Sequence, residues 1–280
     1  MTVAAEEGRL PGQRIGAWLL FGLLAIYLLL PLLSLLLYSL ATVWRANILP
    51  DGYTASHWLE AFSSPRVVGA FLRSTIVATV VVLLDIALVV PAAYWARVRN
   101  PRVRTIVELS AAIPFALPYV VIAFGILRLV GSTTATAWLL GSPWLLILGH
   151  AAICFPFLYW AVDGAMSAAG IERLSEAAEA CGARPGQIVR RVVLPNITPG
   201  LVAGGILVFA TSFGEFALAQ VLSGAAFETV PLWQVDALDQ TEGKFNQLAV
   251  VTFVTFGLLF ALSAAVVFWN RGQTIRLLPG

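Results

Sequence analysis

The stretch EAAEACGAR, residues 176–184, is the most informative part of this chain, and it continues to Val193-Leu194-Pro195. It is polar and rich in alanine and glycine, yet strongly apolar segments lie on both sides of it. Apolar segments of this length are typical of helices that cross a membrane. A polar segment kept between two of them lies on one face of the membrane, where a partner protein has access to it.

The composition indicates an integral membrane protein. Hydrophobic residues make up 59% of the chain, charged residues only 11%, and the mean hydropathy is +0.87, which is far from the balance of soluble domains. A helix needs about 20 apolar residues to cross a hydrocarbon core of about 30 Å. We therefore predict an all-α membrane protein with six transmembrane helices. Their approximate ranges are 15–40, 75–95, 106–130, 144–166, 200–222 and 248–269.

An even number of spans places both termini on the same side of the membrane. Basic residues favour the cytoplasmic side, and most of the 17 Lys and Arg residues lie in the termini and in the loops that share their side. We therefore expect cytoplasmic ends at residues 1–14 and 271–280, and a single transmembrane domain over residues 15–270. The loop at residues 171–195 is then cytoplasmic too. The basic residues on this side of the membrane favour contact with anionic lipid headgroups, and we do not interpret them as nucleic-acid-binding residues.

The local pattern of this loop predicts a helix, a tight turn and a second helix. The first helix covers residues 171–180, and Gly182 ends it because glycine accepts the left-handed geometry that closes a helix. The second helix starts at Pro185, a favourable residue for a first turn, and we expect Leu194-Pro195 to break it. Small side chains let another protein approach the backbone of this loop. They belong to Ala177, Ala178, Gly182 and Ala183.

These residues carry a resemblance to a known family. Glu176-Ala177-Ala178, then Gly182, Ile188 and Leu194-Pro195, resemble the "EAA" loop of the permease subunits of binding-protein-dependent ABC importers. The resemblance extends from about Arg73 to Trp269, and six spans with this loop between the fourth and the fifth match the layout of the family. The alternative is an ordinary amphipathic helix at the membrane surface.

The resemblance implies a multi-pass permease of type I importer architecture in the cytoplasmic (inner) membrane of a bacterium or archaeon. It also implies that the loop fits a cleft in a cytoplasmic ATPase. The partners it implies are two ATPase subunits, a second and different permease chain, and an extracytoplasmic solute-binding protein. The residues it assigns to ATPase coupling are Glu176, Ala177, Ala178, Gly182, Ala183 and Arg184.

The chain lacks the sequence needed to hydrolyse ATP by the usual route. A phosphate-binding P-loop ends in Gly-Lys-Ser/Thr, whereas Lys244, the only lysine, follows Gly243 and precedes Phe245. We therefore expect no enzyme activity and no cofactor in this chain, with ATP and Mg²⁺ bound by the partner ATPase. No metal site is expected either, because no Cys, His or Asp at ligand spacing surrounds His57 or His150.

The candidate transport pathway rests on two features within the spans. Glu215 lies in the sequence SFGEF, residues 212–216, and an acidic residue at a helix centre costs roughly 2.5 to 3.5 kcal/mol unless it faces protein or water. It either lines the translocation cavity, together with Phe213, or makes a structural hydrogen bond. Pro114 and Pro118 must kink the third span, which makes Pro118 and Tyr119 either gate elements or parts of a structural kink.

The remaining ionisable residues of the spans have simpler interpretations. Asp85 is expected to anchor helix packing, and Asp163 to lie at the cytoplasmic end of its span as an interfacial anchor. Glu108 is expected to form a local ion pair with a nearby arginine. His150 is expected to be a packing histidine rather than a ligand.

The sequence narrows the transported solute only to a group of classes. The Phe-Gly-Glu-Phe segment and the two-proline third span look more like permeases for polyamines, phosphonates, ferric iron or oxyanions than like those for sugars. A sugar or glycerol-phosphate permease shares the architecture and is the alternative. A proton-coupled carrier or a membrane-embedded enzyme is disfavoured, because no nucleophile and base occur at motif spacing and the polar loop would have no purpose.

Overall fold

The computed structural model describes residues 11–45, 47–239 and 245–274, and its regular structure there is helical apart from one isolated bridge between Ala41 and Tyr53. The chain divides into two compact units, one made of Met1–Ser63 with Gln240–Phe256 and the other of Ser64–Asp239 with Gly257–Gly280. The described residues contain five helices that are long and apolar enough to cross a membrane, and one strongly bent helix pair. Counted with that pair as one span, they agree with the six predicted spans.

The first unit contains α1 (Pro11–Leu40), α2 (Ser56–Ser63) and the beginning of α12 (Phe245–Thr274). The Asn246 side chain donates hydrogen bonds to the carbonyl oxygens of Tyr38, at 2.9 Å, and Ala41, at 2.8 Å. The Trp58 indole donates to the Ser39 hydroxyl at 3.2 Å and meets the Phe253 ring edge-on. These contacts join the end of α1 to α2 and to the start of α12.

The core of the second unit is formed by α3 (Pro65–Tyr94), α6 (Pro143–Ala169) and α9 (Leu194–Gly214), which pack against one another. Two glycines let α9 approach α6 closely. A Cβ on Gly200 would lie 2.6 Å from the carbonyl oxygen of Ala161, and one on Gly204 would lie 2.9 Å from the Leu158 side chain. Small residues four apart are a common device for packing helices in membranes, so no larger residue fits either position without moving α6.

The predicted kink in the third span is confirmed and is larger than a bend within one helix. The segment consists of α4 (Pro101–Ala116) and α5 (Tyr119–Gly131), whose axes differ by 110°. Leu117 between them is extended, with φ −118° and ψ 138°, because the ring of the following proline disfavours the helical conformation for the residue before it. Pro118 therefore ends one helix and starts the other.

The prediction of one helix over residues 200–222 is wrong. Helix α9 ends at Gly214, Glu215 is extended with φ −76° and ψ 121°, and a separate short helix, α10 (Ala217–Leu222), follows. The chain then continues through a 3₁₀ turn, η4 (Gly224–Phe227), into α11 (Val230–Asp239). The physical reason for the break is that the Glu215 side chain accepts backbone N–H groups of α10, which replaces the bonds of a continuous helix.

The predicted break at Leu194-Pro195 is also wrong. The backbone remains helical from α8 (Pro185–Ile188) through a π-helical turn, η3 (Val189–Val193), into α9. In this turn the Leu194 N–H donates to the Val189 carbonyl, five residues back. Pro195 lies in the first turn of α9, where the missing N–H of proline costs little. The wider π-helical turn before it lets the helical backbone continue through this position.

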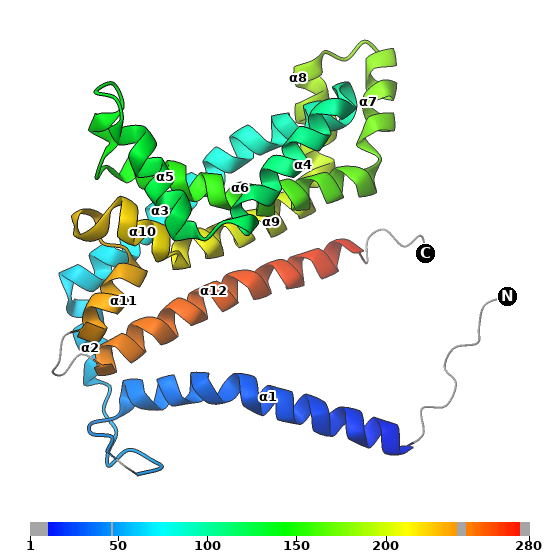
Figure 1. Ribbon diagram of the computed structural model, residues 1–280. Helices are drawn as coiled ribbons and strands as arrows, with labels where there is room; N and C mark the ends of the chain where they lie inside the picture. The colour runs from blue at the N-terminus through cyan, green and yellow to red at the C-terminus, as the bar shows by residue number, and fades with distance from the viewer. Residues whose placement is uncertain (1–10, 46, 240–244, 275–280) are drawn as a thin grey trace. The chain divides into compact units, whose positions relative to one another are not determined.

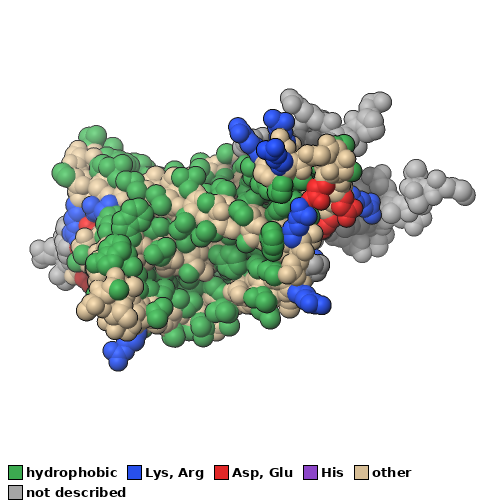
Figure 2. Space-filling model, turned by 90° about the horizontal axis from the view of Figure 1, so that it is seen from above, with side chains coloured by type: hydrophobic (Ala, Val, Ile, Leu, Met, Phe, Trp, Pro, Cys, Tyr) green, Lys and Arg blue, Asp and Glu red, His purple; other side chains and the backbone are tan. Residues whose placement is uncertain are grey.

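The two ends of the second unit carry different elements. Figure 1 shows α7 (Ile171–Ala180) and α8 at one end, and α10 and α11 at the other. A second π-helical turn, η1 (Trp95–Arg99), extends α3 toward α7, and a 3₁₀ turn, η2 (Ala137–Leu139), follows α5. Figure 2 shows charged side chains gathered toward the ends of the face that it presents, with hydrophobic side chains over most of the surface between them.

Candidate coupling loop and transport pathway

The turn after α7 has the hydrogen bonds of a Schellman motif. The Ala183 N–H donates to the Ala178 carbonyl at 3.0 Å, and the Gly182 N–H donates to the Glu179 carbonyl at 2.8 Å. Gly182 has φ +79°, the left-handed geometry that this motif requires and that only glycine adopts readily. The predicted role of Gly182 in ending the helix is confirmed. The Arg184 N–H then donates to the Gln187 side chain at 2.8 Å, which starts α8.

The predicted coupling residues do not all face the same way. Glu176, Ala177, Gly182 and Arg184 are exposed, whereas Ala178 and Ala183 are half-buried against the apolar core. Nothing lies within 4 Å of a Cβ built on Gly182. The surface that this loop offers to a partner is therefore narrower than the run of small residues indicates.

The three glutamates of α7 have different surroundings. Glu172 accepts from Arg97 at 2.7 Å, and Glu179 forms an ion pair with Arg99, so both are tied to the π turn at the end of α3. Glu176 is exposed, and within the described residues it has no ion pair. Of the three carboxylates, it alone is both exposed and unpaired within the described residues.

Arg97 is a candidate site residue that the sequence analysis does not single out. Its side chain is only 6% exposed and reaches the Asp163 carboxylate at 2.8 Å and the Asp163 carbonyl oxygen at 3.1 Å, in addition to Glu172. Arg104 joins from α4, at 3.3 Å from Asp163, and pairs with Glu108 at 2.9 Å. The local ion pair predicted for Glu108 is confirmed, and Asp163 connects α6 to both arginines. The sequence signal is the run Arg97-Val98-Arg99, which directly follows a predicted span.

Glu215 is held by the fold in two ways. Its Oε2 accepts the N–H groups of Leu218 at 2.8 Å and Ala219 at 3.2 Å, and so caps α10. The same oxygen lies 3.6 Å from Nε2 of His150, whose Nδ1 shares a 2.9 Å hydrogen bond with the Ser212 hydroxyl. Both the His150 and the Glu215 side chains are at most 5% exposed. Of the two interpretations of Glu215, this geometry matches the structural hydrogen bond.

The other predicted pathway residues are only partly brought together. Tyr119 is half-buried at the start of α5, which packs against α10, the helix that Glu215 caps. Pro118 is exposed at the bend. Phe213 is fully buried, with its ring 6.1 Å from that of Phe71 and 5.8 Å from that of Phe209. The broken third span and the break at Glu215 thus meet through α5 and α10, whereas Phe213, on α9, packs against Phe71 of α3.

Comparison with known families decides the identity of this arrangement. Residues 88–272 match the family described as the binding-protein-dependent transport system inner membrane component. The chain belongs to this family. It is a multi-pass permease subunit of an ABC importer in the inner membrane, and it is not an enzyme. Membership implies a complex with an ATPase and a solute-binding protein.

Several curated proteins are similar to this permease. The probable ABC transporter permease y4fN of Sinorhizobium fredii is 27% identical over 270 residues, which are 92% of this chain but only 46% of that protein. The molybdenum permease ModB of Mycobacterium tuberculosis is 34% identical over 182 residues, 61% of this chain and 68% of that protein. The putative 2-aminoethylphosphonate permease PhnV of Salmonella typhimurium is 24% identical over 90% of this chain and 93% of its own length. A shorter match, over 126 residues, is to the spermidine/putrescine permease PotC of Haemophilus influenzae.

A solved structure has the same fold. A chain of a bacterial ABC transporter that imports the acidic polysaccharide alginate superposes with a TM-score of 0.71, at 17% sequence identity, over 96% of this chain and 99% of that one. The all-helical architecture predicted from the apolar spans, and its likeness to importer permeases, are therefore confirmed.

Proposed function

We propose that this permease pairs with a second, different permease chain to form an alternating-access pathway for a small oxyanion delivered by a solute-binding protein. Two ATPase subunits bind the ATP and Mg²⁺, and their closure pushes on the exposed face of α7 and on the turn at Gly182. The observation that carries this proposal is the division of α7: two glutamates are tied to the permease itself, and Glu176 is exposed.

The pairing with a second permease has support from the y4fN protein. This chain spans less than half of that relative's length, which leaves room there for a second unit of the same size. We propose that a second unit of this kind completes the pathway for the present permease. Exposed apolar side chains along α1 suit contact with lipid or with such a partner.

An oxyanion is favoured by the named relatives and by the surroundings of Glu215. ModB and PhnV carry the names of a molybdenum and a phosphonate permease, and molybdate and phosphonates are both tetrahedral oxyanions. The Glu215 carboxylate accepts two backbone N–H groups. Because these hydrogen bonds already stabilise its negative charge, Glu215 gives little reason to expect a cationic substrate. A polyamine, as in the PotC name, is the second candidate. Pro118 and Tyr119 form the hinge of the pathway in this proposal, with Phe213 and Glu215 shaping its outer part.

The test is ATP hydrolysis by the complex reconstituted in lipid with its ATPase and binding protein. The solutes are molybdate, 2-aminoethylphosphonate, putrescine, a ferric complex and a disaccharide. We expect an oxyanion to stimulate hydrolysis, and Glu176→Lys or Gly182→Asp to abolish the stimulation, while Glu108→Gln, a change in a local surface pair, leaves it intact. Stimulation by putrescine or by the sugar alone would overturn the oxyanion assignment. A permease that does not associate with any ATPase would overturn the proposal as a whole.

A further inference from the structure

Helix α3 and the π turn η1 form one helical segment, Pro65–Arg99, of 35 residues. At 1.5 Å per residue such a helix is about 50 Å long, enough to cross the membrane and extend beyond it. It contains Pro91, but the helical backbone continues through that position. The α3 part of the segment packs against α6 and α9, which restrains bending.

At the α7 end, this helix carries two ion pairs that we call the inner clasp, Arg97 with Glu172 and Arg99 with Glu179. The two glutamates are seven residues apart, which places them two turns apart on the same side of α7. The clasp therefore holds both ends of α7 to the end of α3. A displacement of α7 cannot occur without moving α3 or breaking both pairs.

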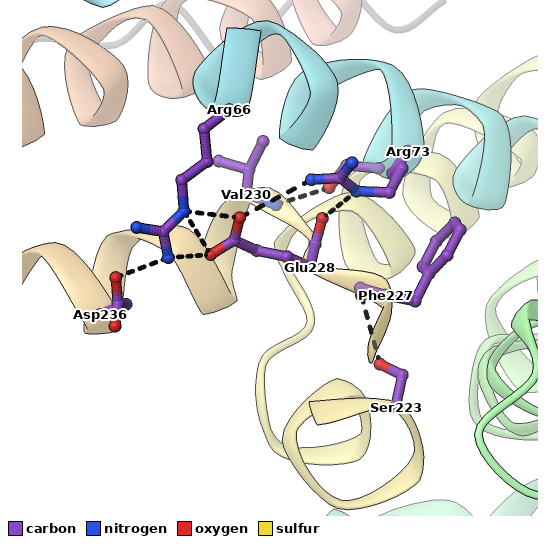
Figure 3. Close-up of polar contacts among 8 residues, drawn as sticks. Arg66, Arg73, Ser223, Phe227, Glu228, Val230 and Asp236 are labelled. Carbon is purple, nitrogen blue, oxygen red and sulfur yellow. Dashed lines mark hydrogen bonds and ion pairs between the residues drawn. The ribbon is translucent and has the colours of Figure 1, made fainter. Parts of the chain in front are cut away.

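At the opposite end, Arg66 and Arg73 form a second set of ion pairs that we call the outer clasp. Arg66 lies 2.6 Å from Glu228 and 2.6 Å from Asp236, and Arg73 lies 3.7 Å from Glu228. Figure 3 shows both arginines extending from α3 toward Glu228, with Asp236 on the far side of Arg66. The clasp ties α3 to the segment between η4 and α11.

Two further hydrogen bonds strengthen this connection. Arg73 Nε donates to the Glu228 carbonyl oxygen, and the Val230 N–H donates to the Ser74 hydroxyl at 2.8 Å. Ser74 is buried, so this bond is shielded from water. The segment that leads into α11 is thus held to α3 by its backbone as well as by its charges.

The outer clasp borders an open cleft of about 220 Å³. Arg66, Glu228 and Asp236 lie on its wall, together with Gln220 of α10 and Asp239 at the end of α11. A protein that binds at this end of the permease therefore reaches the clasp directly. The clasp is 15% exposed at Glu228 and 44% exposed at Arg66, so it is open to rearrangement by such a contact.

We propose that α3 transmits the signal between the binding protein and the ATPase, with the outer clasp as its input and the inner clasp as its output. This inference rests on the proposed function, because it takes α7 as the element that the ATPase contacts. Arg66, Arg73, Arg97 and Arg99 are then positioning residues, since they act through the helix that they join. A contact that shifts α11 moves the outer end of α3, and the inner clasp passes the motion to α7 about 45 Å away.

The test compares stimulated with basal ATP hydrolysis in the reconstituted complex, with loaded binding protein added. The outer variant is Glu228→Gln and the inner variant is Glu172→Gln with Glu179→Gln, while Glu108→Gln is the matched control. We expect both to keep basal hydrolysis and to lose binding-protein stimulation at least about fivefold, which is the lower range of allosteric coupling. Combining the two should cause no further loss, because both interrupt the same transmission.

Several outcomes would overturn the inference. Full stimulation in either variant would do so, and so would losses that multiply in the combined variant, because independent local effects add in free energy. A charge swap distinguishes the loss of the ion pair from a general structural defect. Arg99→Glu should lose stimulation, and adding Glu179→Arg should restore it because the pair then forms with reversed charges. Failure of the swap to restore stimulation counts against the clasp. If instead the unmodified complex shows no stimulation at all, the proposed function itself has failed.

Discussion

Glu176 on α7 and Glu215 between α9 and α10 are both acidic, yet their surroundings are opposite. Glu176 is exposed on a helix whose other glutamates are already paired. The Glu215 side chain is 5% exposed, and its Oε2 accepts two N–H groups of α10 next to His150. The difference teaches that two acidic residues of one chain can serve opposite purposes: the Glu215 carboxylate is bound within the fold, whereas the exposed Glu176 is accessible for the contact with the ATPase that we propose. The two should therefore respond to mutation in different assays.

The largest expected effect is on coupling and comes from the α7 loop. Glu176→Lys should reduce solute-stimulated ATP hydrolysis by at least about tenfold, as truncated or reversed charges at a buried contact cost about 2 kcal/mol or more. Its thermal stability should not change, because no ion pair within the described residues involves Glu176. Hydrolysis assays and thermal unfolding of the same preparation check both halves. A large drop in stability would show that Glu176 supports the fold after all.

The next effect is on stability and comes from the other glutamate. Glu215→Ala removes the cap of α10 and should destabilise the permease by about 1–2 kcal/mol, the usual cost of losing a helix N-terminal cap. Glu215→Gln should retain much of the stability, because the amide oxygen still accepts the N–H groups of Leu218 and Ala219. Thermal unfolding in detergent measures both. Equal stability of the alanine variant and the unmodified protein would remove the structural role of Glu215.

A smaller effect concerns acidification. The pKa of Glu172 lies below its ordinary value: partial burial acts to raise it, but hydrogen bonds from its own backbone N–H and from Arg97 outweigh burial. A lowered pKa means that the contribution of Glu172 to stability is present above the pKa of a free glutamate, about 4.3, and is lost as the pH falls below it. The protection of the α7 amides, measured as the hydrogen-exchange rate relative to the intrinsic rate at the same pH, should therefore decrease between pH 5 and about pH 3. In Glu172→Gln this loss of protection should be smaller, and an unchanged loss would assign it to other groups.

The smallest expected effect is that of a local surface pair. Glu108→Gln breaks the pair with Arg104, four residues away on the same helix, and pairs of this kind contribute about 0.3–0.5 kcal/mol. The thermal midpoint and the coupling ratio should both stay within experimental error. A coupling defect in this variant would mean that the ion pairs around Asp163 act as one network that includes Glu108.

Much of this arrangement could be predicted from local sequence rules. The lengths of the apolar segments predicted the spans, two prolines predicted the break in the third span, and Gly182 predicted the end of α7. Each of these features depends on only a few neighbouring residues. The prediction failed at Pro195, where a π turn keeps the helix continuous. It also failed at Glu215, where the side chain replaces helix bonds.

The ion pairs of Arg97 and Arg99 lay beyond the reach of sequence analysis for a different reason. Whether Glu172, Glu176 or Glu179 meets these arginines depends on the rotation of α7 about its axis, which the packing of Ile171 and Ser175 against the body of the permease determines. Such packing involves residues far apart in the chain. The sequence shows which residues are charged, but it does not show which glutamate pairs with which arginine.

The most direct test of the central claim is cross-linking from α7 to the ATPase. In a Cys181→Ser background, which removes the exposed native thiol, Glu176→Cys and the buried Ser175→Cys are treated with a short thiol-reactive cross-linker in the assembled complex. The account predicts a product with the ATPase at position 176 and none at position 175. A product at 175 alone, or none at 176 in a complex that still hydrolyses ATP, would contradict the assignment of this face to the ATPase.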